Sequence, residues 1–577
     1  MKNRELAALF QKMADILECK NDNPFKINAY RKSARILNDL TDDLEKIVQA
    51  GTLQDIPGIG KGTAEKITEY LQTGTIAAFE HIRKDIGDEL IALLGIPGLG
   101  PKTVALLHSE LKIKSLEDLQ KVIADGRITE LPGMGKKKIQ NIVRGIELYA
   151  AGKERMPLDE ALTTARETIA CLKKATDIAT IEAAGSLRRG KETIGDIDIL
   201  ATGKNKKEII NTFVHLPLVH AVLAQGETKG SIVTNAGVQV DLRVVDKDSF
   251  GAALHYFTGS QAHNVHLRKL AKQEHLKINE YGIFLADKKI GGRRENDIYA
   301  ALHMDWIPPE LREDRGEIEA ARTHSLPALL ERSDIKGDLH VHSTYSDGAH
   351  TLKEIVLKAQ EMGYRYIAVT DHSQSLKIAR GLSPEHLKAK IEEGKRLNTL
   401  FSDIEILIGA EVDIKNDGTL DYPDTLLKQL DLVIGAIHSG FKQPRQQITK
   451  RMVTAMHNPY LHIVAHPTGR LLGERDPYDV DMDQLIEAAG KTGTALEINA
   501  YTQRLDLDDS NVLKAKEKGV MIAIGTDAHH LDQLWMMELG VLTARRGWLE
   551  PQHVLNTFTA EELRAWTRGK LARMNNR

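Results

Sequence analysis

Seven short apolar runs between residues 337 and 530 constrain the fold of this chain more than any other feature. The C-terminal ends of these runs hold nearly all the histidines and acids of interest, and a helix is expected to follow each run. The runs are "GDLHVHS", "YIAVTDHS", "EILIGAEVD", "LVIGAIHSG", "HIVAHPTGR", "TALEINAY" and "VMIAIGTDAHH". Short continuous apolar runs are typical of buried parallel strands. The pattern predicts a barrel of parallel strands, with a site where the carboxyl ends of the strands meet.

The ends of these runs hold most of the candidate metal ligands. A strand places alternate side chains on one face, so His340 and His342 should face one cavity. The predicted set is His340, His342, Asp347, His372, Glu411, His438, His466, Asp527 and His529. Burying nine such groups is too costly unless metal ions coordinate them. The set contains no cysteine and suits zinc, manganese or iron, with up to three ions; His350, His462 and His530 are expected to be exposed or supporting.

The first 150 residues have helical spacing and contain one loop pattern three times. The loops are "IPGIGKGTAEKI", "IPGLGPKTVALL" and "LPGMGKKKIQNI", starting at residues 56, 96 and 131. Each glycine-rich turn precedes a helix start, where free N–H groups suit a phosphate. Plain helical hairpins that need glycine turns are the alternative, but three copies favour binding to the DNA backbone. The predicted contacts are Gly58, Gly60, Lys61, Gly98, Gly100, Gly133 and Gly135, with further charge from Lys102 and the run Lys136 to Lys138.

From about residue 155 strands alternate with helices, and two strands carry paired acidic residues. "TIGDIDILATG" places Asp196 and Asp198 on one side, and "GVQVDLRVVD" places Asp241 similarly. Three carboxylates on neighbouring strands can hold two Mg²⁺ ions. An isolated Asp-x-Asp is usually a solvated strand end, but this one follows Gly185-Ser186 and Arg188-Arg189, which can bind phosphates.

These stretches resemble the palm and thumb of family X DNA polymerases, the polymerase beta relatives. The resemblance covers "GSLRRGKETIGDIDIL", "VDLR" and "YFTGSQAHNVHLR", within residues 1–317. It implies template-directed nucleotide addition in short DNA gaps, with Asp196, Asp198 and Asp241 as catalytic metal ligands. It further implies triphosphate contacts at Gly185, Ser186, Arg189 and Gly195, a sugar pocket at Tyr256, Phe257 and Gly259, a base contact at Asn264 and a template contact at Arg268.

The same family often contains a 5′-deoxyribose phosphate lyase, which implies Lys66 as the Schiff-base nucleophile. Lys26 and Tyr30 match phosphate and support positions. Phe25 and Gly62, however, stand where the animal enzymes have a histidine and a lysine. An amine nucleophile needs cationic neighbours or burial to lower its pKa. A helix-surface lysine near DNA therefore stays as the alternative interpretation of Lys66.

The C-terminal runs resemble the PHP phosphoesterase domain, a (β/α)7 barrel. All nine ligand positions are filled, which implies an active metal centre that hydrolyses phosphoesters. Arg470 in "HPTGR" is expected to hold the phosphate. Residues 313–334 are charged and are expected to form a helical linker.

Length and composition agree with a multidomain enzyme. The chain has 577 residues, a net charge of −3 and two cysteines, Cys19 and Cys171. A disulfide framework is therefore not expected, and the chain should be cytoplasmic without a membrane span. The expected domains are two helix-hairpin-helix domains (1–80 and 81–150), an α+β nucleotidyltransferase palm (151–255), a thumb (256–317), a linker (318–334) and the barrel (335–577).

The two resemblances together imply a monomeric DNA repair enzyme that binds gapped or nicked DNA and dNTPs. The expected activities are gap filling with Mg²⁺ and a 3′–5′ exonuclease with Mn²⁺ or Zn²⁺. Further candidate activities are cleavage at abasic sites, 3′-phosphate removal and a weak lyase. A DNA-tethered phosphatase of small phosphoesters and a non-catalytic scaffold are the alternatives; the hairpins disfavour the phosphatase, and the intact ligand sets disfavour the scaffold.

Overall fold

The computed structural model describes residues 2–575 except 21, 40–43, 57, 97–98, 136–137, 140–141, 144–145 and 147–154. The chain divides into two compact units. One comprises Met1–Met156, Thr164–Ala183 and Gly195–Lys247, and the other comprises Pro157–Thr163, Ala184–Ile194 and Asp248–Arg577. The helical N-terminal region, the α+β region and the C-terminal barrel are all present, so the predicted multidomain fold class is confirmed.

The N-terminal region is helical. Its helices are α1 (Lys2–Cys19), α2 (Pro24–Asp39), α3 (Leu44–Gln49), α4 (Lys61–Thr73), α5 (Ala77–Ile86), α6 (Asp88–Ala92), α7 (Pro101–Leu111) and α8 (Leu116–Ala124). They enclose two apolar cores. Phe10, Leu17 and Ile67 belong to the first core, and Leu107 and Leu119 belong to the second. Each core buries the apolar stripes that the helical spacing predicts.

A five-stranded sheet follows in the same unit. Its strands are β2 (Ile178–Ala183), β4 (Ile197–Gly203), β5 (Val219–Gln225), β6 (Lys229–Thr234) and β7 (Gln239–Val244), in the order β2-β4-β7-β6-β5. β4 and β7 pair in parallel, and the other neighbours are antiparallel. Helix α12 (Lys206–Val214) packs on the sheet and buries Ile210 and Phe213. The chain before and within this sheet also forms β1 (Met156–Pro157), α10 (Leu158–Ala175), α11 (Gly185–Arg188) and β3 (Thr193–Ile194), of which α11 and β3 belong to the second unit.

The thumb region lies in the second unit. Its elements are α13 (Phe250–Thr258), α14 (Gln261–Gln273), β8 (Leu276–Asn279), β9 (Gly282–Leu285), β10 (Lys288–Gly291), α15 (Asn296–Ala301) and α16 (Glu317–Arg322). The segment expected to be a helical linker contains only α16 and a short 3-10 turn, Arg332–Asp334. The N–H of Leu330 donates to the carbonyl of Leu549 at 2.9 Å. The segment therefore packs on the barrel instead of forming a free helix.

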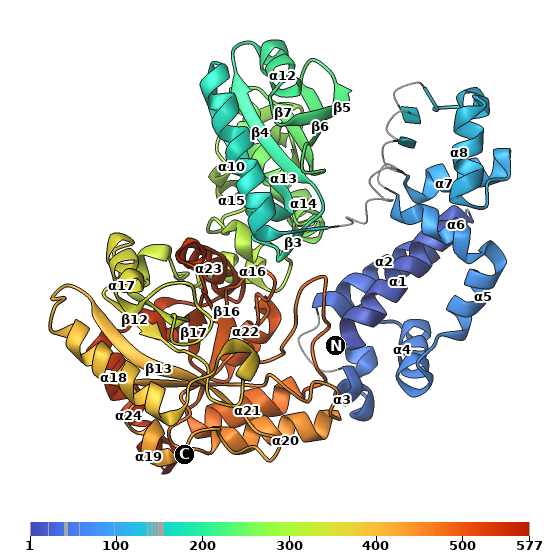
Figure 1. Ribbon diagram of the computed structural model, residues 1–577. Coiled ribbons are helices and arrows are strands. Elements are labelled where there is room, and N and C mark those ends of the chain that lie inside the picture. Colours follow the sequence, from blue (N-terminus) through green and yellow to red (C-terminus); the bar gives the residue numbers. More distant parts are fainter. Residues whose placement is uncertain are drawn as a thin grey trace. The chain divides into compact units, whose positions relative to one another are not determined.

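The barrel is built from seven parallel strands in chain order (Figure 1). The strands are β11 (Gly337–Val341), β12 (Tyr366–Val369), β13 (Glu405–Asp413), β14 (Leu432–Ala436), β15 (Ile463–Val464), β16 (Ala495–Asn499) and β17 (Ile522–Gly525). A parallel bridge between Val341 and Ala528 brings the first and last strands together. Alternate residues of β12 face two cores: Tyr366 and Ala368 face one, while Ile367 and Val369 face the other. This period of two is what carries alternate side chains inward.

Helices follow the strands and cover the outside of the barrel (Figure 1). They are α17 (Leu352–Glu361), α18 (Pro384–Asn398), α19 (Asp424–Leu427), α20 (Arg445–Met456), α21 (Met482–Thr492), α22 (Asp509–Glu517), α23 (Met537–Arg546), α24 (Ala560–Arg568) and α25 (Lys570–Asn575). Side chains cap several of these helices at their start, as the hydroxyl of Thr351 does for α17 and the carboxylate of Asp508 does for α22. The predicted (β/α)7 arrangement is confirmed.

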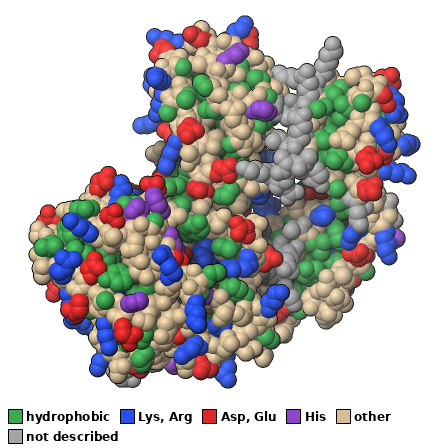
Figure 2. All heavy atoms as spheres, in the orientation of Figure 1, with side chains coloured by type: hydrophobic (Ala, Val, Ile, Leu, Met, Phe, Trp, Pro, Cys, Tyr) green, Lys and Arg blue, Asp and Glu red, His purple; other side chains and the backbone are tan. Residues whose placement is uncertain are grey.

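Charged side chains of both signs are interspersed over the visible face of the barrel (Figure 2). This distribution agrees with the small net charge of the chain. Within the described ranges, none of the helices has the length and apolar character needed to cross a membrane.

Candidate metal centres

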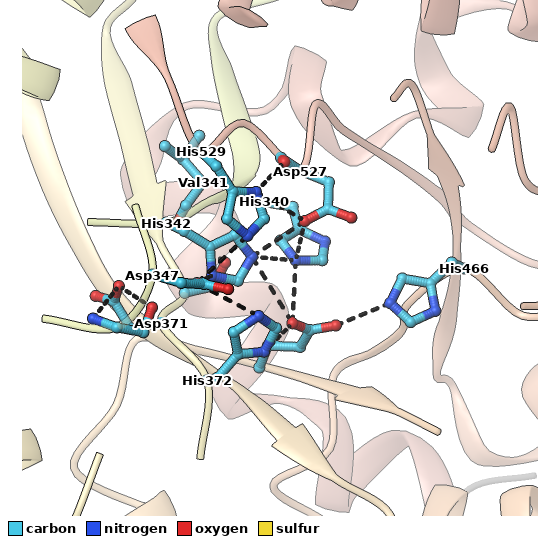
Figure 3. Close-up of polar contacts among 12 residues, drawn as sticks. His340, Val341, His342, Asp347, Asp371, His372, His466, Asp527 and His529 are labelled. Carbon is cyan, nitrogen blue, oxygen red and sulfur yellow. Dashed lines mark hydrogen bonds and ion pairs between the residues drawn. The ribbon is translucent and has the colours of Figure 1, made fainter. Parts of the chain in front are cut away.

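The carboxyl ends of the barrel strands bring together all nine groups predicted from the sequence, of which Figure 3 labels all but Glu411 and His438. His340 Nε2 lies 3.1 Å from His342 Nε2, which lies 3.1 Å from Asp527 Oδ1. Three groups of candidate ligands have all their donor atoms within 4.8 Å of one another: His340, His342 and Asp527; His342, Asp347, His372 and His529; and His372, Glu411 and His438. The ninth residue, His466, has its Nε2 atom 2.9 Å from Glu411 Oε1.

Burial and charge set different protonation states for neighbouring rings. Burial alone would lower the pKa of His340, but nearby carboxylates, Glu497 foremost, raise it well above its usual value. Burial lowers the pKa of His342 to about 4, and the adjacent rings of His372 and His529 contribute to this shift. A neutral imidazole such as that of His342 is the form that can bind a metal ion.

Buried polar atoms without a hydrogen-bond partner show where a cation would fit. Among the residues that the structure describes, they include His342 Nδ1 and His466 Nδ1. Leaving such an atom unsatisfied costs about 1–3 kcal/mol. Imidazoles mixed with carboxylates form a donor set that manganese, zinc and iron accept. The residues therefore fit a centre with several metal ions.

The cluster is open on one side. The side chains of Asp347 and His529 are 31% and 34% exposed, whereas that of His342 is fully buried. Asp347 and His529 lie 3.3 Å apart between Oδ1 and Nε2. A substrate would therefore reach the cluster from the side of these two residues.

The second candidate centre lies on the five-stranded sheet. The parallel register of β4 and β7 sets Asp198 directly opposite Asp241. Burial, reinforced by Asp196 and Asp241, raises the pKa of Asp198 to about 7. Burial and Asp241 also raise the pKa of Asp196. A bound cation would offset this repulsion, and an all-carboxylate set suits Mg²⁺.

The palm aspartates form a looser set than the barrel ligands. Asp241 accepts hydrogen bonds from the Ser231 hydroxyl and the Gln239 amide, and it pairs with Lys229 Nζ at 3.0 Å. Within the described residues, all groups whose donor atoms lie within 4.8 Å of one another belong to the barrel. In the palm, protein donors occupy part of the coordination that a metal ion would take.

The segment that precedes the aspartates holds the predicted triphosphate contacts Gly185, Ser186 and Arg189. Gly185 (φ 62°) begins the short helix α11 in a left-handed conformation that suits glycine. The Arg189 guanidinium pairs with Glu313, with Nε 3.0 Å from Oε1, and donates to the Thr258 carbonyl. Gly195 starts the stretch of the other unit that leads into β4.

The residues predicted to form the sugar and base pocket lie around the end of α13 and the start of α14. The ring of Tyr256 lies edge-on to that of Phe257. Gly259 has φ 71°, and a Cβ atom there would lie 3.2 Å from Arg189 Nη1. The Asn264 amide donates to the Tyr256 carbonyl at 2.8 Å. Arg268 Nε donates to the Asn264 carbonyl at 3.1 Å.

The three N-terminal loops share one backbone hydrogen bond. The N–H groups of Ile59, Leu99 and Met134 each donate to the residue three positions earlier, at 3.0, 3.0 and 3.1 Å. Gly60 and Gly100 are the N-caps of α4 and α7, and neither helix start has a side-chain cap. Pro101 has no N–H, so the N–H groups that these helix starts can offer to an anion are those of Lys61, Gly62 and Lys102.

The other glycines of these loops support the tight turns. Gly58 and Gly133 have φ angles of 101° and 77°, and Gly135 accepts from the N–H of Lys138 at 2.9 Å. Gly98, Lys136 and Lys137 lie outside the described residues.

Lys66, the predicted lyase nucleophile, lies on α4. Its Nζ is 5.9 Å from the centroid of the Tyr30 ring and donates to the Gly62 carbonyl at 3.0 Å. Lys26 forms an exposed ion pair with Asp22 at 3.1 Å. The Tyr30 ring therefore lies close to the Lys66 amine, whereas the Lys26 amine pairs with Asp22.

Comparison with known proteins gives matches for each region of the chain. Residues 1–76 match the helix-hairpin-helix domain, and 90–147 match the SAM-like helix-hairpin-helix tandem. Residues 155–259 and 253–313 match the DNA polymerase beta palm and thumb. Residues 338–501 match the PHP domain. The chain is 40% identical to "DNA polymerase/3'-5' exonuclease PolX" of Bacillus subtilis over 98% of this chain and 99% of the relative. The chain belongs to the PolX family.

Other relatives match parts of this PolX family chain. A probable phosphatase of Thermoanaerobacter sp. is 32% identical over 38% of this chain and 89% of its own length. DNA polymerase lambda of Arabidopsis thaliana is 25% identical over 54% of this chain and 62% of its own length. These relatives cover only part of the chain, whereas PolX of Bacillus subtilis matches the palm, the thumb and the PHP barrel together.

Sequence reasoning missed the residues that support the barrel ligands. Glu497 accepts from His340 Nδ1 at 2.6 Å and from the His466 N–H at 2.7 Å. Asp371 accepts from the Ser343 N–H at 2.7 Å and so fixes the loop that leads to Asp347. Such partners orient metal-binding rings. The signal for Glu497 was that it is an acidic residue inside "TALEINAY", the sixth predicted strand.

Arg470 lies in a different environment from the one expected of a phosphate ligand. Its side chain is 5% exposed and pairs with Glu192, with Nη2 2.7 Å from Oε2. It also donates to the carbonyls of Arg504 and Leu505. Arg504, which sequence reasoning did not single out, has its Nε 3.5 Å from Asp527 Oδ2. Arg504 is thus the guanidinium beside the metal cluster.

Proposed function

We propose that this chain fills short gaps in DNA with its palm and hydrolyses DNA 3′ ends with its barrel. The observation that supports this most directly is the presence of two separate ligand sets, on two separate cores, in a chain that aligns with a polymerase/exonuclease over 98% of its length. The proposed substrates are gapped or nicked DNA and dNTPs, and we propose a monomeric, cytoplasmic enzyme.

For nucleotide addition, the proposed ligands of two Mg²⁺ ions are Asp196, Asp198 and Asp241. When bound, such ions activate the primer hydroxyl and neutralise the triphosphate. The chain itself would orient the triphosphate through the backbone at Gly185 and the guanidinium of Arg189. The contacts of Asp241 with Ser231 and Lys229 hold its carboxylate in place on β7.

For hydrolysis, the nine barrel ligands would hold Mn²⁺ or Zn²⁺, up to three ions, which supply an activated water when bound. The DNA end would enter beside Asp347 and His529, the exposed members of the cluster. Arg504, whose Nε lies 3.5 Å from Asp527 Oδ2, would contact a phosphate oxygen. The proposed reaction is 3′–5′ exonucleolytic cleavage, with abasic-site cleavage and 3′-phosphate removal as further activities of the same centre.

A DNA-tethered phosphatase of small phosphoesters is the second candidate function. The probable phosphatases among the relatives favour it for the barrel alone, because they match only about a third of this chain. The three hairpin loops, with two helix starts free of side-chain caps, favour DNA as the substrate.

Primer extension and degradation on DNA with a one-nucleotide gap test the proposal. A 5′-labelled primer should be extended with Mg²⁺ and dNTPs, and it should be shortened with Mn²⁺ in their absence. A chain that leaves the primer unchanged but releases phosphate from small phosphoesters would support the phosphatase instead.

A further inference from the structure

The segment 184–194, which we call the Arg-Arg loop, contacts the barrel directly. The loop contains the proposed triphosphate contacts Gly185 and Arg189, and it belongs to the same compact unit as the thumb and the barrel. A Cβ atom on Gly190 (φ 64°) would lie 3.4 Å from Leu542 Cβ on barrel helix α23. Helix α23 therefore packs closely against the loop.

Two barrel arginines bind the loop through their guanidinium groups. Arg546, on α23, donates from Nη1 to the Arg189 carbonyl at 2.7 Å. Arg470 pairs with Glu192 at 2.7 Å. Both guanidinium groups are nearly fully buried, with side chains 4% and 5% exposed. A buried charged hydrogen bond of this kind fixes the position of its partner more firmly than a surface ion pair does.

Arg546 also shares a carboxylate with Arg189. Oε1 of Glu313, a thumb residue, lies 3.0 Å from Arg189 Nε, 3.1 Å from Arg546 Nη1 and 3.4 Å from Lys191 Nζ. Nη2 of Arg546 pairs with Asp509 at 2.6 Å, and Arg315 pairs with the same carboxylate at 3.1 Å. Four cations thus surround two carboxylates, so Glu313 keeps cationic partners when one of them leaves.

This arrangement bears on how Arg189 could reach a triphosphate. Arg189 is held by Glu313 and the Thr258 carbonyl, and it must weaken its contact with Glu313 to form a new one with a phosphate. Arg546 and Lys191 attract the same carboxylate oxygen, and this weakens the electrostatic attraction between Glu313 and Arg189. Arg546 also keeps the Arg189 backbone fixed while the side chain moves.

We propose that Arg546 of the barrel is a positioning residue for nucleotide addition, which anchors the Arg-Arg loop and keeps Glu313 neutralised so that Arg189 is available to the incoming triphosphate. This inference rests on the proposed function of the palm. Under this proposal the barrel supports nucleotide binding through Arg546, and this role does not depend on hydrolysis by the barrel.

The test is steady-state gap filling by the full chain, with KM for dNTP and kcat measured separately. Arg546→Met should raise the KM for dNTP about five- to ten-fold and change kcat less than about two-fold, since it affects triphosphate binding. Arg545→Met is the matched control. Arg545 neighbours Arg546 on α23, but its guanidinium donates to Glu310 of the thumb and to the Leu330 carbonyl instead of to the loop. It should leave the KM unchanged.

A second variant keeps the test decisive if Arg546→Met lowers the thermal unfolding midpoint. Glu192→Gln removes the ion pair with Arg470 from the loop side, and it should raise the KM for dNTP about three-fold without changing kcat. Wild-type KM in both Arg546→Met and Glu192→Gln would overturn the inference. Equal increases in Arg545→Met and Arg546→Met would also overturn it, because they would indicate general loosening of the barrel. A wild-type chain without gap filling would instead refute the proposed function.

Discussion

Aspartates at the two candidate centres have opposite pKa shifts. Burial and two neighbouring carboxylates raise the pKa of Asp198 to about 7. Burial would also raise the pKa of Asp527, but His340 and other nearby rings lower it well below its usual value. The palm therefore has an unbalanced negative charge that favours a cation, whereas the barrel contains imidazoles that partly balance its acids.

Asp198→Ala should abolish nucleotide addition, with a loss of at least about 1000-fold, because metal-centred charge stabilisation supplies several kcal/mol. Hydrolysis by the barrel should stay at the wild-type rate. Gap filling and primer degradation on the same DNA measure both effects. Asp246→Ala is the control, since Asp246 follows β7 but its side chain is 78% exposed. Nucleotide addition at the wild-type rate by the Asp198 variant would contradict the palm assignment.

At the scale of elements, the hairpin loops and the thumb show how short segments acquire fixed geometry. The repeated loops owe their shape to glycine turns and backbone hydrogen bonds, which are local. The thumb depends on a distant pairing instead. Glu295, just before α15, accepts from Arg188 at 2.7 Å and from the fully buried Arg312 at 2.6 Å. Helix α15 is thus tied to the Arg-Arg loop by charge.

Glu295→Gln should lower the thermal unfolding midpoint of the chain at pH 7 by several degrees, because removing one partner of a buried pair costs about 3–5 kcal/mol. Burial would raise the pKa of Glu295, but Arg312 and Arg188 lower it well below the usual value of 4.5. Its stabilisation is therefore present above pH 4.5 and is lost as the pH falls further.

The difference between wild type and Glu295→Gln should consequently shrink by about 1 kcal/mol between pH 7 and pH 4. Thermal unfolding of both proteins across this range measures it. Glu319→Gln serves as the control, because the Glu319 side chain is 63% exposed. A difference that grows toward pH 4 would contradict the assignment of an ionised Glu295.

A second prediction at this scale concerns the helix after the first hairpin. If Lys66 is a lyase nucleophile, borohydride should trap a covalent adduct on incised abasic DNA, and Lys66→Ala should reduce trapping at least about ten-fold. The exposed Lys84 on α5 provides a control variant, Lys84→Ala. Unchanged trapping in Lys66→Ala would assign the adduct to another amine, and no trapping in the wild type would leave Lys66 as a surface lysine near DNA.

At the scale of the whole molecule, the two centres lie on separate cores. The palm aspartates belong to the five-stranded sheet, and the histidine cluster belongs to the barrel. Mutations at sites that share no partners act independently. The Arg-Arg loop is the exception that we propose, since it joins the barrel to the nucleotide site through Arg546.

His342→Ala should remove primer degradation, with a loss of at least about 100-fold, because His342 belongs to two of the three ligand groups. Gap filling should persist. Degradation should require Mn²⁺ or another transition metal more than Mg²⁺, since imidazole ligands suit the former. The matched control is His457→Ala, at an exposed histidine after α20. Degradation as fast as wild type in the His342 variant would show that the barrel is not the nuclease.

Sequence alone determined the features that depend on local periodicity. The period of two placed His340 and His342 on one face, and the apolar runs located all seven barrel strands. The glycine-rich loops were recognisable because a turn and a helix start need only adjacent residues. Because the carboxyl ends of parallel barrel strands meet at one site, nine ligands from positions far apart in the chain could be assigned to that site.

Only the tertiary structure decided which distant residues support these centres. Glu497 orients His340 across 157 positions, and Arg546 reaches Arg189 across 357. Arg470 matched the pattern of a phosphate ligand, yet the packing of the Arg-Arg loop on the barrel supplied Glu192 as its partner. Side-chain partners of this kind depend on how separately folded elements pack. A buried charge takes the nearest opposite charge in space, and no spacing along the chain encodes that distance.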